Sequence, residues 1–349
     1  MTILDLADKS AWLPASSGKS LLSETLRLSR NIKGYHFPEH AGDKELAAAA
    51  GIVEKAVKRW NEEKEDPLYP ISLAALSDTE RAMLEDKGFL PSPLPNRPER
   101  MALYVNESGD MSVLVNGTDH IEIRCAGSDP DRLWRKASYL DSQLGRDISY
   151  AFDKEFGYLT ASPYRVGTAL RLSAVLFVPG LVGSGALSEA AARAAREGFT
   201  LKGFYENLDM RMPYVELTNA VTLGVKEETL AARMEQLLDD LEAAEHLGWS
   251  KVFKAGEMNL KDKVWRALGA LKYARLMSRE ETISAAALIA AGIREDMFPD
   301  KDKNLVSRLL EAASGAYVAE TTHKDNLDDE EEALWRAVLV RGIIERAGF

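Results

Sequence analysis

Arg171 is the residue of this sequence that most clearly suggests chemistry. It lies where the apolar segment LRLSAVLFV begins, directly after the polar loop FGYLTASPYRVGTA. A guanidinium stays protonated and binds phosphate oxygens in pairs, so Arg171 is suited to contact an anion, and a surface or salt-bridge role is the alternative. A second arginine, Arg165, lies within the same loop.

Other reactive residue types give weaker signals. Ser162 has no Ser-His-Asp order around it, so capping or hydrogen bonding in the loop is the preferred interpretation. The glycines of 183–185 lack the lysine of a phosphate-binding P-loop, which favours a flexible loop. The histidines are scattered without metal-ligand spacing and predict no protein-bound metal site. They are His36, His40, His120, His246 and His323.

Composition narrows the class of protein. The chain has 349 residues, 46% of them hydrophobic, and a formal net charge of −11, which argues against general nucleic-acid binding. Its single cysteine, Cys125, allows no intrachain disulfide and favours a reducing compartment. There is no signal-peptide pattern and no apolar run of the roughly 20 residues that a membrane span needs. We therefore expect a cytoplasmic protein without a membrane partner.

Hydrophobic periodicity predicts a mixed first part of the chain. Short alternating segments separated by turn residues predict an antiparallel meander over 101–127, and further strands follow at 156–160, 170–179, 199–205 and 214–223. The segment LLSETLRLSRN (21–31) predicts a short helix. Three- and four-residue apolar spacing predicts longer helices at 43–63, 78–87, 129–144, 188–197 and 226–247.

Strand patterns disappear after about residue 256, and four helical segments follow within 264–347. The segment GWSKVFKAGEMN (248–259) is the predicted boundary between the two parts. The fold class is therefore α+β, with a mainly antiparallel sheet flanked by helices over 1–255 and an all-helical domain over 256–349.

Several segments, in order, resemble one family. FGYLTASPYRVGTALRLSAVLFVPGLV is similar to the strand-and-loop signature of the ATP:guanido phosphotransferases, and SETLRLSRN, NGTDHIEIR and FTLKGF resemble three further blocks. ALGALKYARLMSREETISAAALIAAGI resembles the helical domain of the bacterial protein-arginine kinases. The resemblance implies a guanidino-kinase fold and phosphoryl transfer from ATP to a guanidinium, with arginines around the triphosphate and a carboxylate as base.

The resemblance also implies roles for individual positions. The catalytic glutamate of the family falls on Thr118 and its reactive cysteine on Ser162. Three nucleotide contacts are lost, at Thr25, Gly88 and Glu122. The nucleotide-binding residues that remain are Ser23, Arg27, Arg171 and Lys202, with Arg124 as a further candidate.

These departures predict a catalytically degenerate homologue, a pseudokinase that acts by binding. Threonine cannot serve as a general base near neutral pH, and a carboxylate about 4 Å from a phosphate repels it by about 4 kcal/mol. ATP with Mg would bind weakly or not at all. The expected partner is a protein, namely an active arginine kinase, its activator or an arginine-phosphorylated protein, and the family favours a homodimer.

Two alternatives stay open. One is an active kinase for protein arginine or another guanidino substrate with a rebuilt site, and the other is an assembly scaffold without a ligand. Arg124 shares a strand face with Glu122 if the segment is extended, and Arg165 could supply another cation. Glu206 and Asp209 could supply a carboxylate if their loop folds inward.

Overall fold

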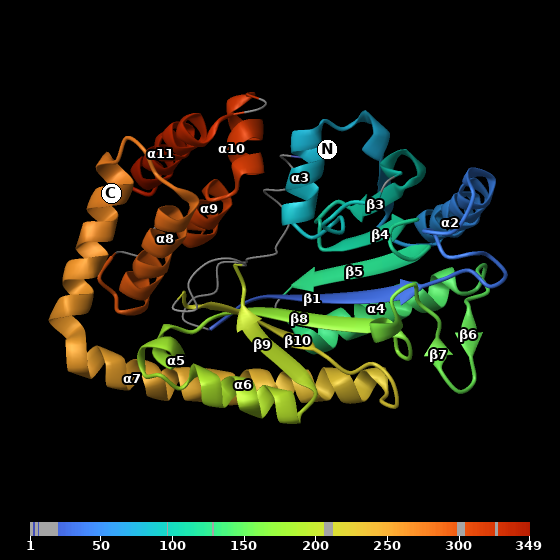
Figure 1. Ribbon diagram of the computed structural model, residues 1–349, viewed down its shortest axis with the longest axis horizontal. Coiled ribbons are helices and arrows are strands. Elements are labelled where there is room, and N and C mark those ends of the chain that lie inside the picture. The colour runs from blue at the N-terminus through green and yellow to red at the C-terminus, as the bar shows by residue number, and fades with distance from the viewer. Residues whose placement is uncertain are drawn as a thin grey trace.

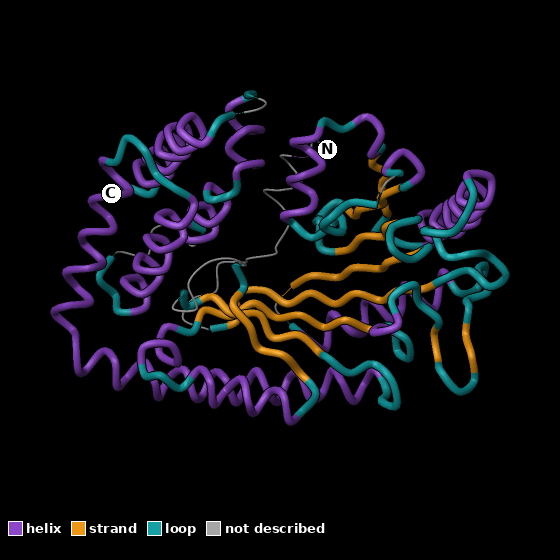
Figure 2. The backbone as a smooth tube through the Cα atoms, viewed as in Figure 1, coloured by secondary structure: helices purple, strands orange, loops and turns teal. Residues whose placement is uncertain are grey.

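The structure is a computed structural model of the chain. It describes residues 3, 6, 20–95, 97–127, 129–205, 212–298, 304–324 and 327–349, and the structural statements below concern these residues. Figure 1 shows a twisted sheet with helices against it and a second group of helices at one end. Figure 2 shows that the strands gather in the first group, while the second is helical.

One eight-stranded sheet forms the centre of the fold. Its order is β2-β3-β4-β5-β1-β8-β10-β9, and neighbouring strands pair antiparallel. This arrangement confirms the predicted α+β class. The strands are β1 (Leu21–Arg30), β2 (Leu68–Ile71), β3 (Ala102–Asn106), β4 (Met111–Val115), β5 (Ile121–Gly127), β8 (Leu170–Phe177), β9 (Phe199–Gly203) and β10 (Tyr214–Asn219), with β6 (Phe152–Asp153) and β7 (Gly157–Tyr158) in a separate hairpin.

The prediction of a helix over 21–31 is wrong, because this segment forms β1 in the middle of the sheet. Leu26 and Leu28 are buried in the main core, whereas Thr25 and Arg27 lie on the opposite face. A period of two residues is that of a strand. The correction matters for function, because it places Arg27 between two neighbouring strands.

Helices cover the apolar face of the sheet. Side chains from α2, α4, α6 and the first half of α7 share one core with Leu26, Leu28 and Leu172. The predicted helices at 43–63, 78–87, 129–144 and 188–197 agree with the structure to within one residue. The helices are α2 (Asp43–Glu63), α3 (Asp78–Asp86), α4 (Pro130–Leu144), α5 (Pro179–Gly183) and α6 (Leu187–Arg196).

Helix α7 (Glu227–Tyr273) joins the sheet to the C-terminal helices. In Figure 1 it runs beneath the sheet and then turns upward along the helical group. The predicted boundary segment 248–259 is helical apart from a kink at Gly256, whose backbone is non-helical, so two helical segments meet there. A domain division at 255/256 would fall at this kink, and it stays a prediction.

The C-terminal helices pack around a second core. This core includes Leu268, Ile283 and Leu309, and it reaches the sheet through Val175 and Tyr214. The helices are α8 (Arg279–Arg294), α9 (Leu305–Ala312), α10 (Gly315–Thr322) and α11 (Asp329–Arg346), of which α10 has no counterpart in the predicted elements. Within the described residues, no helix is both long and apolar enough to cross a bilayer.

Candidate anion-binding site

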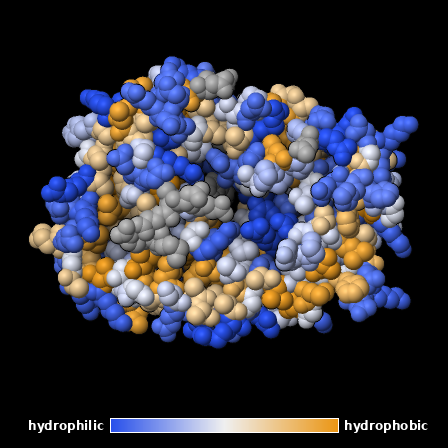
Figure 3. Space-filling model, in the orientation of Figure 1, coloured by the Kyte–Doolittle hydropathy of each residue, from blue (hydrophilic) through white to orange (hydrophobic). Residues whose placement is uncertain are grey.

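Three arginines form a row across the polar face of the sheet. Arg27 on β1 is the register partner of Arg124 on β5 and of Arg171 on β8. Directly opposite residues of neighbouring antiparallel strands lie on the same face, so Arg124, Arg27 and Arg171 are side by side. We call these three residues the arginine row. Figure 3 shows a strongly hydrophilic area beside a hollow near the middle of this view.

Arg27, in the middle of the row, has two described partners. Its Nη2 donates to the carbonyl oxygen of Gly88 at 3.0 Å, and its Nε lies 3.4 Å from a carboxylate oxygen of Glu122. Burial lowers the pKa of Arg27, while Glu122 opposes that shift. Gly88 has a φ of +70°, and a Cβ there would lie 2.7 Å from Arg27 Nη2. The positive φ favours glycine at this position, and a side chain there would have to displace the guanidinium end of Arg27.

Arg124, at one end of the row, is only 2% exposed and incompletely paired. Its Nη2 donates to the carbonyl of Lys87 at 3.2 Å, and its guanidinium lies 4.5 Å from the centre of the Phe89 ring. Its Nε and Nη1 are buried without a hydrogen-bond partner in the described structure. Burial, followed by the charge of Arg27, lowers the pKa of Arg124 to about 9, so the side chain remains cationic at neutral pH.

Arg171, at the other end, lies on the same face at the start of β8. Its Nε is buried and has no hydrogen-bond partner among the described residues. Buried guanidinium nitrogens are normally paired, and each exception requires an explanation. Unpaired donors on both ends of the row are consistent with an anionic ligand.

Glu122 interrupts the positive charge of this face. One carboxylate oxygen faces Arg27, and the other lies 3.4 Å from Arg165 Nη1. Arg165 comes from the 3₁₀ turn at 163–165, so the loop before β8 is tied to β5 through Glu122. Two of the four arginines around this point are therefore already paired with a carboxylate of the chain itself.

The positions predicted to have lost catalytic groups carry no replacement. Thr118 is exposed in the turn between β4 and β5. Ser162 precedes the 3₁₀ turn, but its side chain makes no capping hydrogen bond; its carbonyl oxygen accepts instead from Arg165 N at 3.0 Å. The acids Glu206 and Asp209 lie outside the described residues.

The remaining predicted contacts lie on the same face, on β1 itself and on the edge strand β9. Ser23 and Thr25 precede Arg27 on β1 at intervals of two residues, and the hydroxyl of Ser23 is buried without a partner in the described part. Lys202 on β9 lies 3.6 Å from the carboxylate of Glu216 on β10, which also accepts from Ser173. The pairing of Lys202 with Glu216 was not predicted, because it depends on strand register.

Asp119 was not predicted as a functional residue. It connects three of the segments that carry the family resemblance, namely those that contain Asn31, Asp119 itself and Ala161. Its Oδ1 accepts from Asn31 Nδ2 at 2.6 Å and from the backbone N–H of Ala161 at 2.7 Å. Its Oδ2 is buried without a described partner, and burial raises its pKa. The neighbouring His120 also contacts Asn31, at 2.8 Å. These contacts join the segments around Thr118 and Ser162 into one assembled scaffold.

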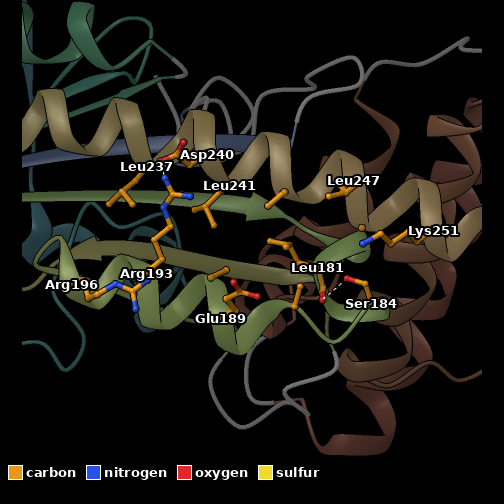
Figure 4. Close-up of a pocket in the computed structure, with 14 residues that line it drawn as sticks. Leu181, Ser184, Glu189, Arg193, Arg196, Leu237, Asp240, Leu241, Leu247 and Lys251 are labelled. Atoms are coloured by element: carbon orange, nitrogen blue, oxygen red, sulfur yellow. Dashed lines mark hydrogen bonds and ion pairs between the residues drawn. The ribbon is translucent and has the colours of Figure 1, made fainter.

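The structure has two further hollows, of which the second lies next to the arginine row through Lys87. A groove of about 460 Å³ runs between α6 and α7, with Leu181 and Leu241 along its floor; Figure 4 shows Arg193 reaching across it to its ion-pair partner Asp240. A cavity of about 490 Å³ lies between α3 and the C-terminal helices. There Lys87 is paired with Glu311 at 2.6 Å. The groove is also lined by Arg196 and Lys251, but unlike the arginine row its cations are not buried on a sheet face that carries the family motifs.

Comparison with protein families identifies the scaffold. Residues 49–247 match the model of the ATP:guanido phosphotransferase C-terminal catalytic domain, which is more than half of the chain. The chain belongs to the ATP:guanido phosphotransferase family. Residues 257–348 match a second model, that of the protein-arginine kinase McsB C-terminal domain.

Relatives match over nearly their whole length. A protein-arginine kinase of Desulforamulus reducens is 29% identical over 338 residues, which cover 95% of this chain and 94% of the relative. A protein-arginine kinase of Clostridium tetani is 28% identical over 335 residues, covering 95% and 97%. The chain is thus a homologue of protein-arginine kinases across both parts of its fold.

Solved structures of other guanidino kinases share the fold. The duplicated taurocyamine kinase from Schistosoma mansoni, with transition-state analogue components bound, gives a TM-score of 0.55 at 20% identity over 70% of this chain and 35% of that one. Lombricine kinase gives a TM-score of 0.55 at 18% identity, with 69% and 71% covered. These neighbours support the fold alone.

The family name implies ATP, and the site fits a nucleotide only in part. The unpaired nitrogens of Arg124 and Arg171 are donors of the type that phosphate oxygens accept from, but they are buried, so a phosphate would have to displace neighbouring groups to reach them. The carboxylate of Glu122 does not fit a nucleotide, because it lies against Arg27 and Arg165 on the same face. Among the described residues, no group of three or more His, Cys, Asp or Glu side chains could hold a metal ion.

Proposed function

We propose that this protein is a degenerate protein-arginine-kinase homologue that acts by binding rather than by phosphoryl transfer. The main support is Thr118, an exposed hydroxyl at the position where the family resemblance places the catalytic glutamate. A positioned general base is usually worth about 10²- to 10⁴-fold in rate, and threonine cannot replace it near neutral pH. The pairing of Glu122 with Arg27 and Arg165 adds to this, because it reduces the positive charge available to a triphosphate.

The retained part of the site suggests what the protein binds. Unpaired donors on Arg124 and Arg171 favour a ligand with a phosphate group. Together with the match of 257–348 to the protein-arginine kinase C-terminal domain, this favours an arginine-phosphorylated protein, an active arginine kinase or its activator as the partner. We propose further that the protein is cytoplasmic and homodimeric.

Phosphoryl transfer is the direct test. The protein is incubated with γ-labelled ATP and Mg²⁺, using free arginine and an arginine-rich protein as acceptors, and we expect no label above background. In parallel, thermal unfolding is followed with phosphoarginine and with Mg-ADP. A ligand that binds only the native state raises the unfolding temperature, so a shift with phosphoarginine supports the binding role.

A rebuilt active kinase is the second candidate, favoured by the positions of Arg124 and Arg165 on the same face as Arg27. Label transfer that disappears in Arg171→Ala would establish this candidate and end the proposal of a binding protein. If neither phosphoarginine nor Mg-ADP changes the unfolding temperature at saturating concentration, the ligand-free scaffold is the correct interpretation.

A further inference from the structure

Glu122 has the geometry of a bound anion. Its two carboxylate oxygens face different guanidinium groups, those of Arg27 and Arg165, each at 3.4 Å. The side chain of Glu122 is 22% exposed, and those of Arg27 and Arg165 are 20% and 28% exposed, so solvent reaches all three. A carboxylate between two guanidinium groups makes the same contacts that a phosphate would make there.

The other two arginines of this face are not engaged in the same way. Arg124 and Arg171 have no carboxylate partner among the described residues, and each keeps at least one buried nitrogen without a hydrogen bond. The four arginines are thus divided into two pairs. One pair holds Glu122, and the other pair has buried nitrogens that no carboxylate of the described chain neutralises.

We propose that Glu122 is a built-in competitor that makes this site select a single phosphate group over a chain of phosphates. A single phosphate can bind at the Arg171 end of the arginine row while Arg27 and Arg165 stay paired with Glu122. A polyphosphate chain extends farther across the face and must displace Glu122 or lie against it. Like charges in contact repel, so the longer anion loses the affinity that its extra charge would otherwise bring.

The inference rests on the proposed binding role of the site, because it explains which anions that site accepts. It does not require catalysis. It goes beyond the loss of a nucleotide-binding arginine, since a neutral residue at position 122 would leave Arg27 and Arg165 available, whereas glutamate occupies both.

The test compares two anions of different length on the full chain. Binding of inorganic phosphate and of inorganic tripolyphosphate is measured by isothermal titration calorimetry for the unaltered protein, for Glu122→Gln and for Glu257→Gln. Glutamine keeps the size of Glu122 and removes its charge. Glu257 is the matched control, because it is also ion-paired, to Lys261 at 2.6 Å, but on the distal part of α7.

We expect Glu122→Gln to strengthen tripolyphosphate binding by about tenfold or more and phosphate binding by less than about threefold. Glu257→Gln should change neither. Equal gains for the two anions, or no gain for tripolyphosphate in a variant that unfolds at the normal temperature, would overturn the inference. So would an equal gain in Glu257→Gln, because net charge alone would then explain it.

A second substitution identifies the released group. Adding Arg165→Gln to Glu122→Gln should remove most of the gain for tripolyphosphate, since the double variant lacks one of the two arginines set free. A gain that persists in the double variant contradicts the pairing of Glu122 with Arg165. These outcomes are separate from those of the transfer assay: active transfer would end the proposed binding role, whereas an unchanged selectivity would end only this inference.

Discussion

Buried arginines differ between the two parts of this molecule. In the C-terminal helices, Arg336 is 2% exposed and donates to the carbonyls of Ala312 and Met277 and to the carboxylate of Glu332. On the sheet, Arg124 is equally buried, but its Nε and Nη1 have no described partner. Each guanidinium nitrogen of Arg336 has an acceptor within the chain, whereas two nitrogens of Arg124 have none among the described residues.

We interpret the difference as one between a structural arginine and the ligand-binding arginine proposed above. Leaving a buried donor unpaired costs about 1 to 3 kcal/mol, so folding alone does not favour Arg124 where it lies. Arg30 is a control within the same strand as Arg27, because it is buried, paired with Asp141 at 2.7 Å and stacked 3.5 Å from the Tyr158 ring. Burial on β1 therefore does not by itself prevent full pairing.

The largest expected effect concerns Arg336→Met. This substitution leaves two carbonyls and the Glu332 carboxylate without their donor, and leaving the two buried carbonyls unpaired costs about 2 kcal/mol or more. Urea unfolding followed by circular dichroism should show the loss. A loss below about 1 kcal/mol would mean that the completeness of its hydrogen bonds does not stabilise the helical part.

A second prediction concerns Glu24, an unpaired carboxyl on the apolar face of the same sheet. It is 1% exposed, its Oε2 has no described partner, and burial raises its pKa to about 8, with Asp129 and Glu235 adding to the shift. The folded protein therefore holds a proton that the unfolded chain releases above its ordinary pKa near 4.5. The contribution of Glu24 to stability is complete below that pH and is lost as the pH rises toward 8.

Glu24→Gln should remove this pH dependence. Relative to the unaltered protein, the variant should gain about 2 kcal/mol of unfolding free energy between pH 5 and pH 8, a conservative figure for a shift of this size. Unfolding curves at several pH values give the difference directly. Parallel curves for the two proteins across that range would show that Glu24 is not protonated in the folded state.

The smallest expected stability effect is that of Arg124→Met, which sharpens the comparison with Arg336→Met. Methionine retains much of the apolar stem and removes the two unpaired nitrogens, so the unfolding free energy should change by less than about 1 kcal/mol. Phosphate binding should weaken clearly in the same variant. A loss of stability as large as that of Arg336→Met, with binding intact, would reverse the roles assigned to the two arginines.

Much of this architecture is predictable from periodicity, but the exceptions lie at the site. Helix α2 was predicted with its observed bounds, because a long apolar stripe identifies both ends. The strand β1 was predicted as a helix, since its leucines and polar residues alternate over too short a span to decide between the two. Family resemblance named Arg27 and Arg171, but only the register of three strands places them beside Arg124.

Partners across the sheet could not be predicted in the same way. Glu122 was recognised as a carboxylate at an arginine position, yet its contact with Arg165 depends on how the loop before β8 folds back. The pairing of Lys202 with Glu216 likewise requires the register of β9 and β10. Such contacts join residues far apart in sequence, and local patterns contain no information on them.

The kink in α7 has a mechanical consequence. Its two regular segments, 227–255 and 257–273, are about 44 Å and about 26 Å long, and each is stiff along its own axis. Its first half is fixed beneath the sheet and its second half among the C-terminal helices. Any rotation of the sheet relative to the C-terminal helices must change the angle between the two segments of α7, and Gly256 is the position at which this change costs least.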